Sequence, residues 1–381
     1  MKHALVRLAL IAVAAAAVAV PVASAAQTAG RAKPARHVVF VQTNELTGNR
    51  IAVYDRAANG LLSRAGTYAT GGNGGAAAGA SSDKLASQGS LAYDAGSAAL
   101  IAVNAGSNTV SLLRVQDDRL TLEDVVASGG DFPTSVAVRP DGLVYVLNAG
   151  GTGIVQGFRL HGGKLHPIHG SARSLGLANT SPPNFLTSPG QVGFTPDGRQ
   201  LIATTKASDS MIDVFAVRPD GRLSNAPISN PAATPVPFAF TFDPSSGRLV
   251  DGEAGTSSVT TYLLHADGTL SDPRSQTDNQ TALCWITRSG GFYYVSNTGS
   301  NTVSAFEIAA NGDPSLATPT GVVANTGAGP IDSAASGDDF LYVEAGAAGV
   351  VDEYRVDADG TLSQIGTATD LQPGIEGIAA N

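Results

Sequence analysis

A turn followed by leucine returns along this chain at a nearly constant interval, and this repeat constrains the fold more than any other feature. Leu223, Leu270, Leu316 and Leu362 lie 47, 46 and 46 residues apart, and an Asp-Gly or Asn-Gly pair precedes each of them. Weaker copies occur upstream, around residues 59–62, 118–120 and 162–165. A regular period of this length is typical of propeller blades or of helical arrays. The chain is therefore expected to be a repeat protein.

The segments between the turns favour strands over helices, because they alternate with a period of two and are often broken by Gly or Pro. One unit contains four such segments, at 135–138, 143–147, 153–160 and after Lys164. Four strands per unit make one propeller blade. A second marker at the expected end of each second strand also occurs seven times: Asn44, Asn104, Asn148, the Thr204-Thr205 pair, Glu253, Asn297 and Glu344. The sequence therefore predicts an all-β fold, a seven-bladed β-propeller with four antiparallel strands per blade.

The two ends of the repeat region predict how the ring closes. Residues 37–41 have the pattern of a second strand that lacks a first, whereas residues 373–379 match a first strand that nothing follows. We expect the C-terminal strand to join blade one, because this pairing removes two exposed sheet edges. Two longer gaps in the repeat, at 71–87 and 177–189, are predicted to be loop insertions.

The N-terminus has the pattern of a secretory signal peptide. Lys2 and Arg7 are followed by an apolar stretch from Leu8 to Val20, and Ala23-Ser24-Ala25 supplies a cleavage site. An uncleaved anchor is the alternative, but a spanning helix needs about 20 apolar residues. We predict a signal peptide at 1–25, a flexible leader at 26–36 and a single propeller domain at 37–381. The protein is then secreted, or held in the periplasm or cell envelope, without a membrane span after signal cleavage.

The net charge of the chain argues against binding to nucleic acid, and its cysteine content excludes an intrachain disulfide. Without Lys2 and Arg7, 21 basic residues stand against 32 acidic ones, which leaves a formal charge of −11 on the mature chain. Such a chain would repel nucleic acid. Cys284 is the single cysteine, so an intrachain disulfide is impossible. No cofactor is expected, and the chain is expected to be a monomer.

Several motifs carry a family resemblance. The turns Pro140-Asp141-Gly142 and Thr195-Pro196-Asp197-Gly198 and the stretch from Asn104 to Val110 resemble the lactonase family of seven-bladed propellers, over roughly His37 to Asn381. Its characterised branches include 6-phosphogluconolactonase and the carboxymuconate-lactonising enzyme. The resemblance implies a cofactor-independent lactonase or cycloisomerase acting on small carboxylated lactones. The units at 145–148 and 294–297 are also similar to the YVTN repeats of bacterial surface proteins, which carry little chemistry.

The chain departs from this family where catalysis is expected. The catalytic branches place a His directly after Pro at the start of one inner strand and an Arg-His pair at another. The matching starts here are Pro133-Thr134, Pro189-Gly190-Gln191, Pro237-Phe238 and Pro330-Ile331-Asp332. A positioned acid-base side chain is worth about 10² to 10⁴ in rate. The family's activity is therefore not carried over, and no catalytic residue is assigned.

The candidate ligand site is the mouth of the channel. In a propeller, the loops that enter the innermost strands and those that leave the second strands lie on this face. Gln88, Phe238, Asp332 and Lys206 are expected near it. The predicted ligand-binding residues are Ser90, Asn104, Thr134, Asn148, Gln191, Glu253, Trp285, Asn297, Glu344 and Glu376.

Each of these residue types has an alternative interpretation. The asparagines could cap turns. The three glutamates could hold a cation or polarise a hydroxyl, or they could lie on solvated surface. Trp285 could stack on a sugar or another ring.

Three further motifs have weaker functional interpretations. His161, His166 and His169 could bind a metal, but they are expected on a surface hairpin of the opposite face, so no metal site is predicted. Cys284 is interpreted as a buried thiol rather than a nucleophile, because no His is expected within reach. The glycine-rich run 71–75 lacks the ending of a phosphate loop and is expected to be a flexible flap.

Two functions are compatible with these features. The first is a secreted propeller that binds a small lactone or sugar-acid ligand at the channel mouth, with hydrolysis or isomerisation as the activity that the resemblance implies. The second is a non-catalytic interaction or adhesion propeller whose partner is a component of the cell envelope. The polar channel mouth supports the first, and the YVTN-like units support the second.

Overall fold

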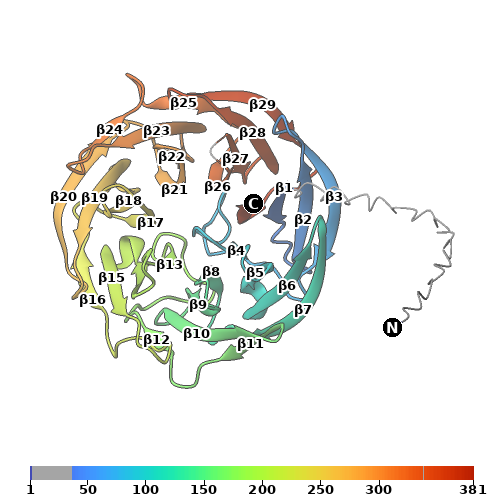
Figure 1. The fold of residues 1–381 in the computed structure, drawn as a ribbon. Helices are drawn as coiled ribbons and strands as arrows, with labels where there is room; N and C mark the ends of the chain where they lie inside the picture. Colours follow the sequence, from blue (N-terminus) through green and yellow to red (C-terminus); the bar gives the residue numbers. More distant parts are fainter. Residues whose placement is uncertain (2–36, 338) are drawn as a thin grey trace. The chain divides into compact units, whose positions relative to one another are not determined.

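The computed structural model describes residue 1, residues 37–337 and residues 339–381, so the predicted signal peptide and leader lie outside the described residues. Residues 36–381 form one compact unit. Within it, seven antiparallel sheets are arranged around an axis (Figure 1). This confirms the predicted seven-bladed propeller with four strands per blade. Two sheets gain a short fifth strand, and two short 3-10 helices occur, η1 (Ala105–Ser107) and η2 (Lys206–Ser208).

The first four blades, from the innermost strand outward, have these bounds: blade 1, β30 (Ile378–Ala380), β1 (His37–Gln42), β2 (Arg50–Arg56) and β3 (Leu62–Ala69); blade 2, β4 (Leu91–Asp94), β5 (Ala99–Asn104), β6 (Thr109–Gln116) and β7 (Arg119–Ala127); blade 3, β8 (Pro133–Val138), β9 (Leu143–Asn148), β10 (Ile154–His161) and β11 (Lys164–Pro167), with β12 (Arg173–Ser174) also on β10; blade 4, β13 (Val192–Phe194), β14 (Gln200–Thr204), β15 (Met211–Ala216) and β16 (Ile228–Pro231).

The other three blades follow the same order: blade 5, β17 (Pro237–Phe242), β18 (Leu249–Glu253), β19 (Ser258–Leu264) and β20 (Leu270–Thr277); blade 6, β21 (Leu283–Ser289), β22 (Phe292–Asn297), β23 (Thr302–Ile308) and β24 (Pro314–Leu316), with β25 (Val322–Asn325) also on β23; blade 7, β26 (Pro330–Ser336), β27 (Phe340–Ala345), β28 (Val350–Val356) and β29 (Leu362–Ala368).

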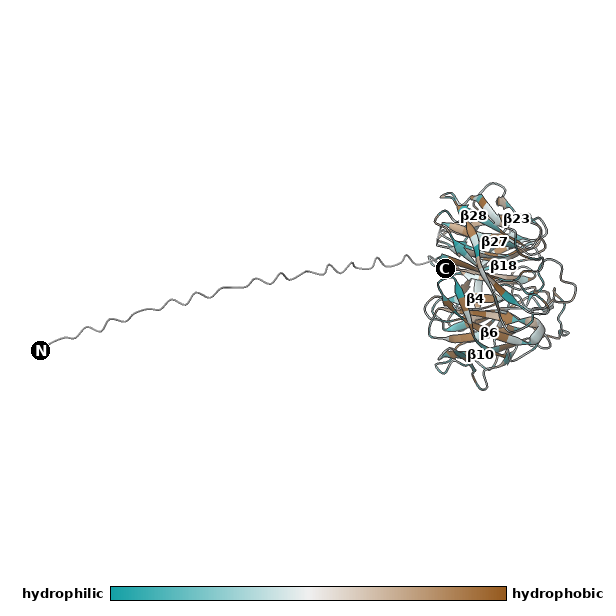
Figure 2. Ribbon diagram, turned by 90° about the vertical axis from the view of Figure 1, so that its right-hand side faces the viewer, coloured by the Kyte–Doolittle hydropathy of each residue, from teal (hydrophilic) through white to brown (hydrophobic). Residues whose placement is uncertain are grey.

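The second strand of each blade is enclosed by its neighbours. All residues of β5, β9 and β27 are buried. A strand that faces packed sheets on both sides must be apolar on both faces, which explains runs such as Leu143–Leu147. Seven apolar clusters result, one at each interface between adjacent blades. Apolar segments run along strands such as β6 and β10 in the edge-on view of Figure 2.

The glycine of the repeated turn fits onto the neighbouring blade. Gly360 has φ +80°, and a Cβ there would lie 2.4 Å from Cε1 of Phe292 on β22. Its carbonyl oxygen accepts a 3.1 Å hydrogen bond from the hydroxyl of Tyr294. Tyr145 donates in the same way to the carbonyl of Gly221, at 2.8 Å. The turn is therefore glycine both because the left-handed backbone favours it and because a side chain would collide with the next sheet.

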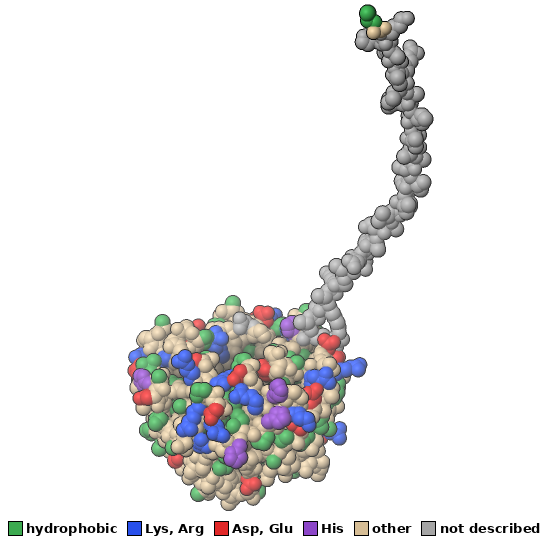
Figure 3. Space-filling view, turned by 60° about the horizontal axis from the view of Figure 1, so that its bottom comes forward, with side chains coloured by type: hydrophobic (Ala, Val, Ile, Leu, Met, Phe, Trp, Pro, Cys, Tyr) green, Lys and Arg blue, Asp and Glu red, His purple; other side chains and the backbone are tan. Residues whose placement is uncertain are grey.

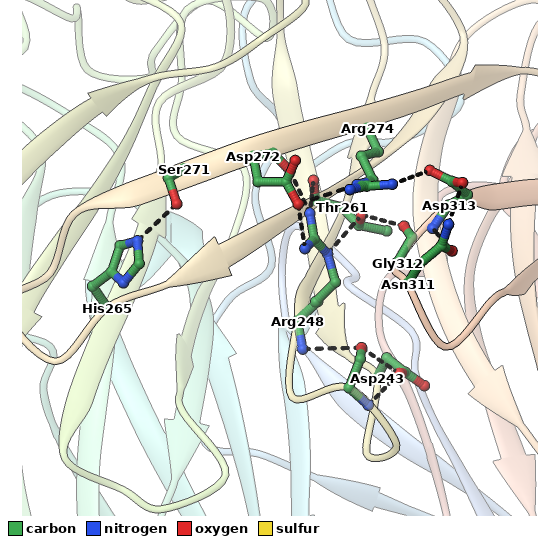
Figure 4. A network of polar contacts seen from close by, with 11 residues as sticks. Asp243, Arg248, Thr261, His265, Ser271, Asp272, Arg274, Asn311, Gly312 and Asp313 are labelled. Carbon is green, nitrogen blue, oxygen red and sulfur yellow. Dashed lines mark hydrogen bonds and ion pairs between the residues drawn. The ribbon is translucent and has the colours of Figure 1, made fainter.

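At the interface of blades 5 and 6, arginine takes the place of the aromatic residue under this turn (Figure 4). A Cβ on Gly312 would lie 2.4 Å from Cδ of Arg248, whose residue is 2% exposed. The guanidinium contacts Asp272 at 3.0 Å and donates to the Thr261 hydroxyl at 3.0 Å. Thr261 in turn donates to the carbonyl of Gly312 at 2.6 Å. The buried charge is thus fully paired, as a charge in this position must be.

The C-terminal strand closes the ring as predicted. β30 pairs with β1, with Val41 opposite Ile378. The closing strand begins at Ile378, later than the start of the strand predicted at residues 373–379. The last residue also takes part, because the Asn381 side-chain oxygen accepts a 2.7 Å hydrogen bond from the amide of Val38. In Figure 1 the C-terminus lies inside the ring, next to β1.

Replacing Gly360 by Ala tests the docking of the turn. We expect a loss of about 2–4 kcal/mol in the free energy of unfolding, because strain at positive φ adds to a collision with Phe292. Gly247→Ala is the matched control, since Gly247 has φ +71° with nothing within 4 Å of the new Cβ. It should cost only about 1 kcal/mol. Urea unfolding measures both, and equal losses would contradict the proposed packing role.

Candidate functional site

An insertion between β3 and β4 fills the predicted channel mouth. This axial loop, residues 70–90, lies in the centre of the ring (Figure 1). The side-chain amide of Gln88 pairs with the backbone of Ile286 on the far inner strand β21, at 2.9 and 3.0 Å. The indole N–H of Trp285 donates to the carbonyl of Ser87 at 3.0 Å. The loop is thus bonded across the axis and closes the channel on this face.

The glycine-rich start of the axial loop is packed rather than a free flap. The side chain of Asn44 exchanges two 2.9 Å hydrogen bonds with the backbone of Gly75. A Cβ on Gly74 would lie 2.1 Å from the carbonyl oxygen of Asn44, and one on Gly72 would lie 2.4 Å from Asn104. The glycines therefore allow the loop backbone to lie against the tops of blades 1 and 2.

Four of the predicted site residues have their side chains within the blades. The Asn104 amide donates to Thr109 and Ser111 on the next strand of its own sheet. Asn297 does the same with Thr302 and Ser304. These contacts are structural, like those of the other two residues of this group, Asn148 and Glu253.

Glu253 is a buried acid at the end of β18, and three hydroxyl groups stabilise its carboxylate. The hydroxyls of Thr234, Thr260 and Tyr262 all donate to its carboxylate. Burial raises the pKa of Glu253, and the three hydroxyls counteract this rise. The carboxylate is therefore satisfied within the sheet and does not reach the mouth.

Of three further predicted residues, Gln191 and Ser90 connect the tops of the inner strands by hydrogen bonds, and Thr134 does not. Gln191 accepts a 2.7 Å hydrogen bond from the amide of Phe240 in the next blade. The hydroxyl of Ser90 donates to the carbonyl of Glu376 at 3.0 Å. Thr134 is buried, and its hydroxyl has no partner within the part of the chain that the structure describes. These contacts fix the spacing of the inner strands.

Glu344 and Glu376 lie together under the axial loop, with Asp83 from the loop and Asp332 from β26. The carboxyls of Asp83 and Glu376 are hydrogen-bonded to each other. Asp332 accepts from the amide of Gly89 at 3.2 Å. Two carboxyls in direct contact cannot both be ionised, so this cluster holds at least one proton. The predicted solvated surface is thus wrong for Glu344 and Glu376, which are 0% and 2% exposed.

Burial is the main cause of the titration behaviour of this cluster. It raises the pKa of Asp332 to about 7 and those of Glu344 and Glu376 well above the usual range, and neighbouring carboxyls add to the rise. The pKa of Asp83 also rises through burial, but Glu376 and Lys206 counteract it. Within the hydrogen-bonded pair, Asp83 therefore ionises before Glu376, and Glu376 keeps the proton. Across the described residues, no group of three or more such side chains is arranged to hold a metal ion.

A cavity of about 300 Å³ opens beside the axial loop, over the tops of blades 4, 5 and 6. Phe238 and Trp285 form its inner wall, with ring centroids 4.9 Å apart. The lining residues are Ser81, Ser82, Asp83, Ala86, Phe185, Leu186, Lys206, Val236, Phe238, Ala254, Gly255, Ala282, Cys284, Trp285 and Thr298. Of the predicted ligand-binding residues, Trp285 is the one that lines this cavity.

Lys206 ties together the two insertions that flank the cavity. Its ammonium group donates to the carbonyls of Ala86, at 2.5 Å, and Phe185, at 2.6 Å, and to the hydroxyl of Ser188, at 2.9 Å. Ala86 belongs to the axial loop, and the other two belong to the second insertion. Burial lowers the pKa of Lys206 to about 8, and Asp83 counteracts this. The ammonium is therefore charged at neutral pH, with all three donors in use.

Cys284 is a buried thiol, as the sequence indicates. Burial raises the pKa of Cys284 to about 12, although Lys206 lowers it. A thiol with such a pKa holds almost no thiolate at neutral pH, and the thiolate is the nucleophilic form. The geometry therefore gives no support to a cysteine nucleophile.

The predicted histidine group lies away from this cavity. His161 and His166 are on β10 and β11, and both pair within that outer hairpin. Figure 3 shows histidines on the surface among basic and acidic side chains. This placement agrees with the interpretation as surface residues.

A second groove runs along the inner strands β8 and β13. It has a volume of about 710 Å³ and includes the turns around Asp141 and Asp197. Its arginine, Arg139, already contacts Asp141 at 2.7 Å and donates to the carbonyl of Gly198 at 2.7 Å. The smaller cavity is the better candidate site, because it combines aromatic walls with buried charged groups.

The fold defines the chain as a seven-bladed β-propeller. No protein-family model matches the chain, and no curated protein sequence matches it. A protein from Lactobacillus plantarum has a TM-score of 0.71 at 17% identity, covering 91% of this chain and 99% of that one. The periplasmic gluconolactonase of Pseudomonas aeruginosa gives 0.71 at 16% identity, covering 91% and 99%. A candidate 6-phosphogluconolactonase of Bacteroides uniformis gives 0.69 at 17% identity, covering 91% and 100%. At these identities the likeness establishes the fold.

The sequence predicts that no membrane span remains after signal cleavage. No helix in the described part of the chain is long and apolar enough to cross a membrane.

Stability should fall as the pH rises from about 5 to 8. A carboxyl whose pKa is higher in the folded state binds its proton more tightly there, so ionisation on raising the pH favours unfolding. For Asp332, whose pKa rises to about 7, the loss over this range is about 2–3 kcal/mol. Urea unfolding at several pH values measures it. Asp332→Asn should flatten the dependence, and equal or greater stability at high pH would contradict this description of the cluster.

Proposed function

We propose that this chain is an exported propeller that binds a small lactone or sugar-acid ligand in the cavity beside Trp285. The observation that carries the proposal is the cavity itself, which the aromatic rings of Phe238 and Trp285 line together with the buried Lys206 and with Asp83. Pockets with aromatic walls and a few placed polar groups are the usual sites for small ligands. Export is inferred from the apolar stretch at 8–20, which lies outside the described residues.

Two features support this ligand class. An aromatic pair offers a flat surface on which a ring can stack. Proteins named as gluconolactonases share the fold along nearly their full length. The proposal is for binding, because Lys206 is protonated and saturated and the Cys284 thiol is neutral. A lactone bound here would meet no thiolate, neutral amine or imidazole base among the lining residues.

Isothermal titration calorimetry of the purified protein tests the proposal. The ligands are δ-valerolactone, dihydrocoumarin, glucono-δ-lactone and gluconate. We expect heat from at least one of them, and we expect Ala254→Leu, which fills the cavity, to weaken binding by about tenfold or more. Because Trp285 is the single tryptophan, its emission should also change with δ-valerolactone.

Leu46→Ala is the matched surface control for Leu186→Ala. Both leucines are exposed, at 61% and 51%, but Leu186 lines the cavity and Leu46 does not. Only Leu186→Ala should alter the affinity. If none of the four compounds binds, the ligand-binding proposal is wrong, and the envelope-interaction alternative becomes the better description.

A further inference from the structure

The charge balance of the cavity distinguishes neutral ligands from anionic ones. Lys206 is the single cation among the lining residues. Its three N–H donors are already bonded to Ala86, Phe185 and Ser188. An anion such as a carboxylate or phosphate could gain a hydrogen bond from Lys206 only by breaking one of these. Displacing a bond to a buried group costs most of what the new bond would contribute.

The charge of Lys206 is also compensated. Asp83 lies on the same cavity wall, and the two groups act on each other's pKa. Of the carboxyls near Asp83, Asp332 has a pKa raised to about 7 and so adds negative charge as the pH rises through neutrality, whereas Glu344 and Glu376 stay protonated. A bound anion would therefore be desolvated without meeting a free cation, and such a group is expensive to bury.

The walls suit an apolar ring. Phe185, Val236, Phe238 and Trp285 supply most of the large side chains. Because the indole N–H of Trp285 is bonded to Ser87, the ring of Trp285 offers the ligand only its apolar surface. The ammonium of Lys206 lies 4.8 Å from the ring centroid of Phe238, so a cation–π contact helps to hold this ring in place.

Few polar groups remain for a ligand. The Thr298 hydroxyl donates to the carbonyl of Pro330 at 2.8 Å. Ser81 and Ser82 make no side-chain hydrogen bond within the described part of the chain, so their hydroxyls remain for a ligand. These two hydroxyls can donate one hydrogen bond each to the carbonyl oxygen and the ring oxygen of a lactone. They cannot satisfy the many hydroxyls of a sugar acid, whose unpaired polar groups would oppose binding.

We infer that the cavity selects an uncharged lactone with a largely apolar ring, and that it discriminates against the ring-opened acid and against phosphorylated sugar lactones. This inference rests on the proposed function and narrows its ligand class. A volume of about 300 Å³ is at the small end for ligand pockets, which suits one ring or two fused rings.

A matched pair of compounds tests the inference. Dihydrocoumarin is a neutral fused-ring lactone, and 3-(2-hydroxyphenyl)propanoate is its ring-opened acid with the same carbon skeleton. Calorimetry should give a Kd for dihydrocoumarin that is lower by about tenfold or more, because only the acid carries a charge to desolvate. Glucono-δ-lactone should likewise bind more tightly than 6-phosphogluconate.

Asp83→Asn serves as the diagnostic variant. It keeps the shape of the side chain and leaves the Lys206 charge uncompensated, so affinity for the ring-opened acid should rise by about threefold or more. The readout is the ratio of the affinities for the acid and for dihydrocoumarin, which should shift toward the acid because only the acid is charged. Thermal unfolding of the variant shows whether the propeller remains folded.

The outcomes separate the two proposals. If the acid or 6-phosphogluconate binds as tightly as the neutral lactones or more tightly, the inference is overturned and the proposed function stands. If neither member of either pair binds, the inference is overturned, and if δ-valerolactone and gluconate also fail to bind, the proposed function is overturned with it. Tighter binding of the neutral members, with the expected response of Asp83→Asn, supports both.

Discussion

The close fit between the repeated outer turns and the preceding blade is the constraint on which the rest of this structure depends. A ring of separate sheets has no common core, so each interface must be stable by itself. The turn glycines meet this demand at Gly221 and Gly360, where backbone carbonyls accept hydrogen bonds from tyrosines of the neighbouring sheet. At the interface of blades 5 and 6, the buried Arg248 takes this role, and its charge is paired with Asp272.

The axial loop changes what this ring can do. A propeller with an open channel would offer the tops of all its inner strands to a ligand. Here the loop bonds to Ile286 and Trp285 across the axis, and a cavity remains beside it over blades 4 to 6. The buried carboxyls under the loop accept its backbone amides. The loop therefore acts both as a plug for the channel and as one wall of the candidate site.

The sequence predicted the features that repeat and missed those that occur once. Blade number, ring closure and the two insertions follow from regular spacing, and a regular pattern tolerates local errors. One such error is Asn44, since the register of β1 and β2 places Gln42 rather than Asn44 at the end of the second strand of blade 1. Side-chain direction was harder, because a shift of one residue reverses the face. Glu344 precedes the end of its strand by one residue and lies in the carboxyl cluster, whereas Glu253 ends its strand and bonds within the sheet.

The path of a long loop has no periodic signal, so Asp83 and Phe185 could not be assigned to the site from sequence. Lys206 gave a partial signal, as a lone lysine that follows the Thr204-Thr205 marker. The most direct test of the whole description is a crystal structure of the protein grown with dihydrocoumarin. It should show the lactone against Phe238 and Trp285, with the axial loop in place. Density for the lactone along β8 and β13 instead, or an axial loop displaced from the channel, would contradict this account.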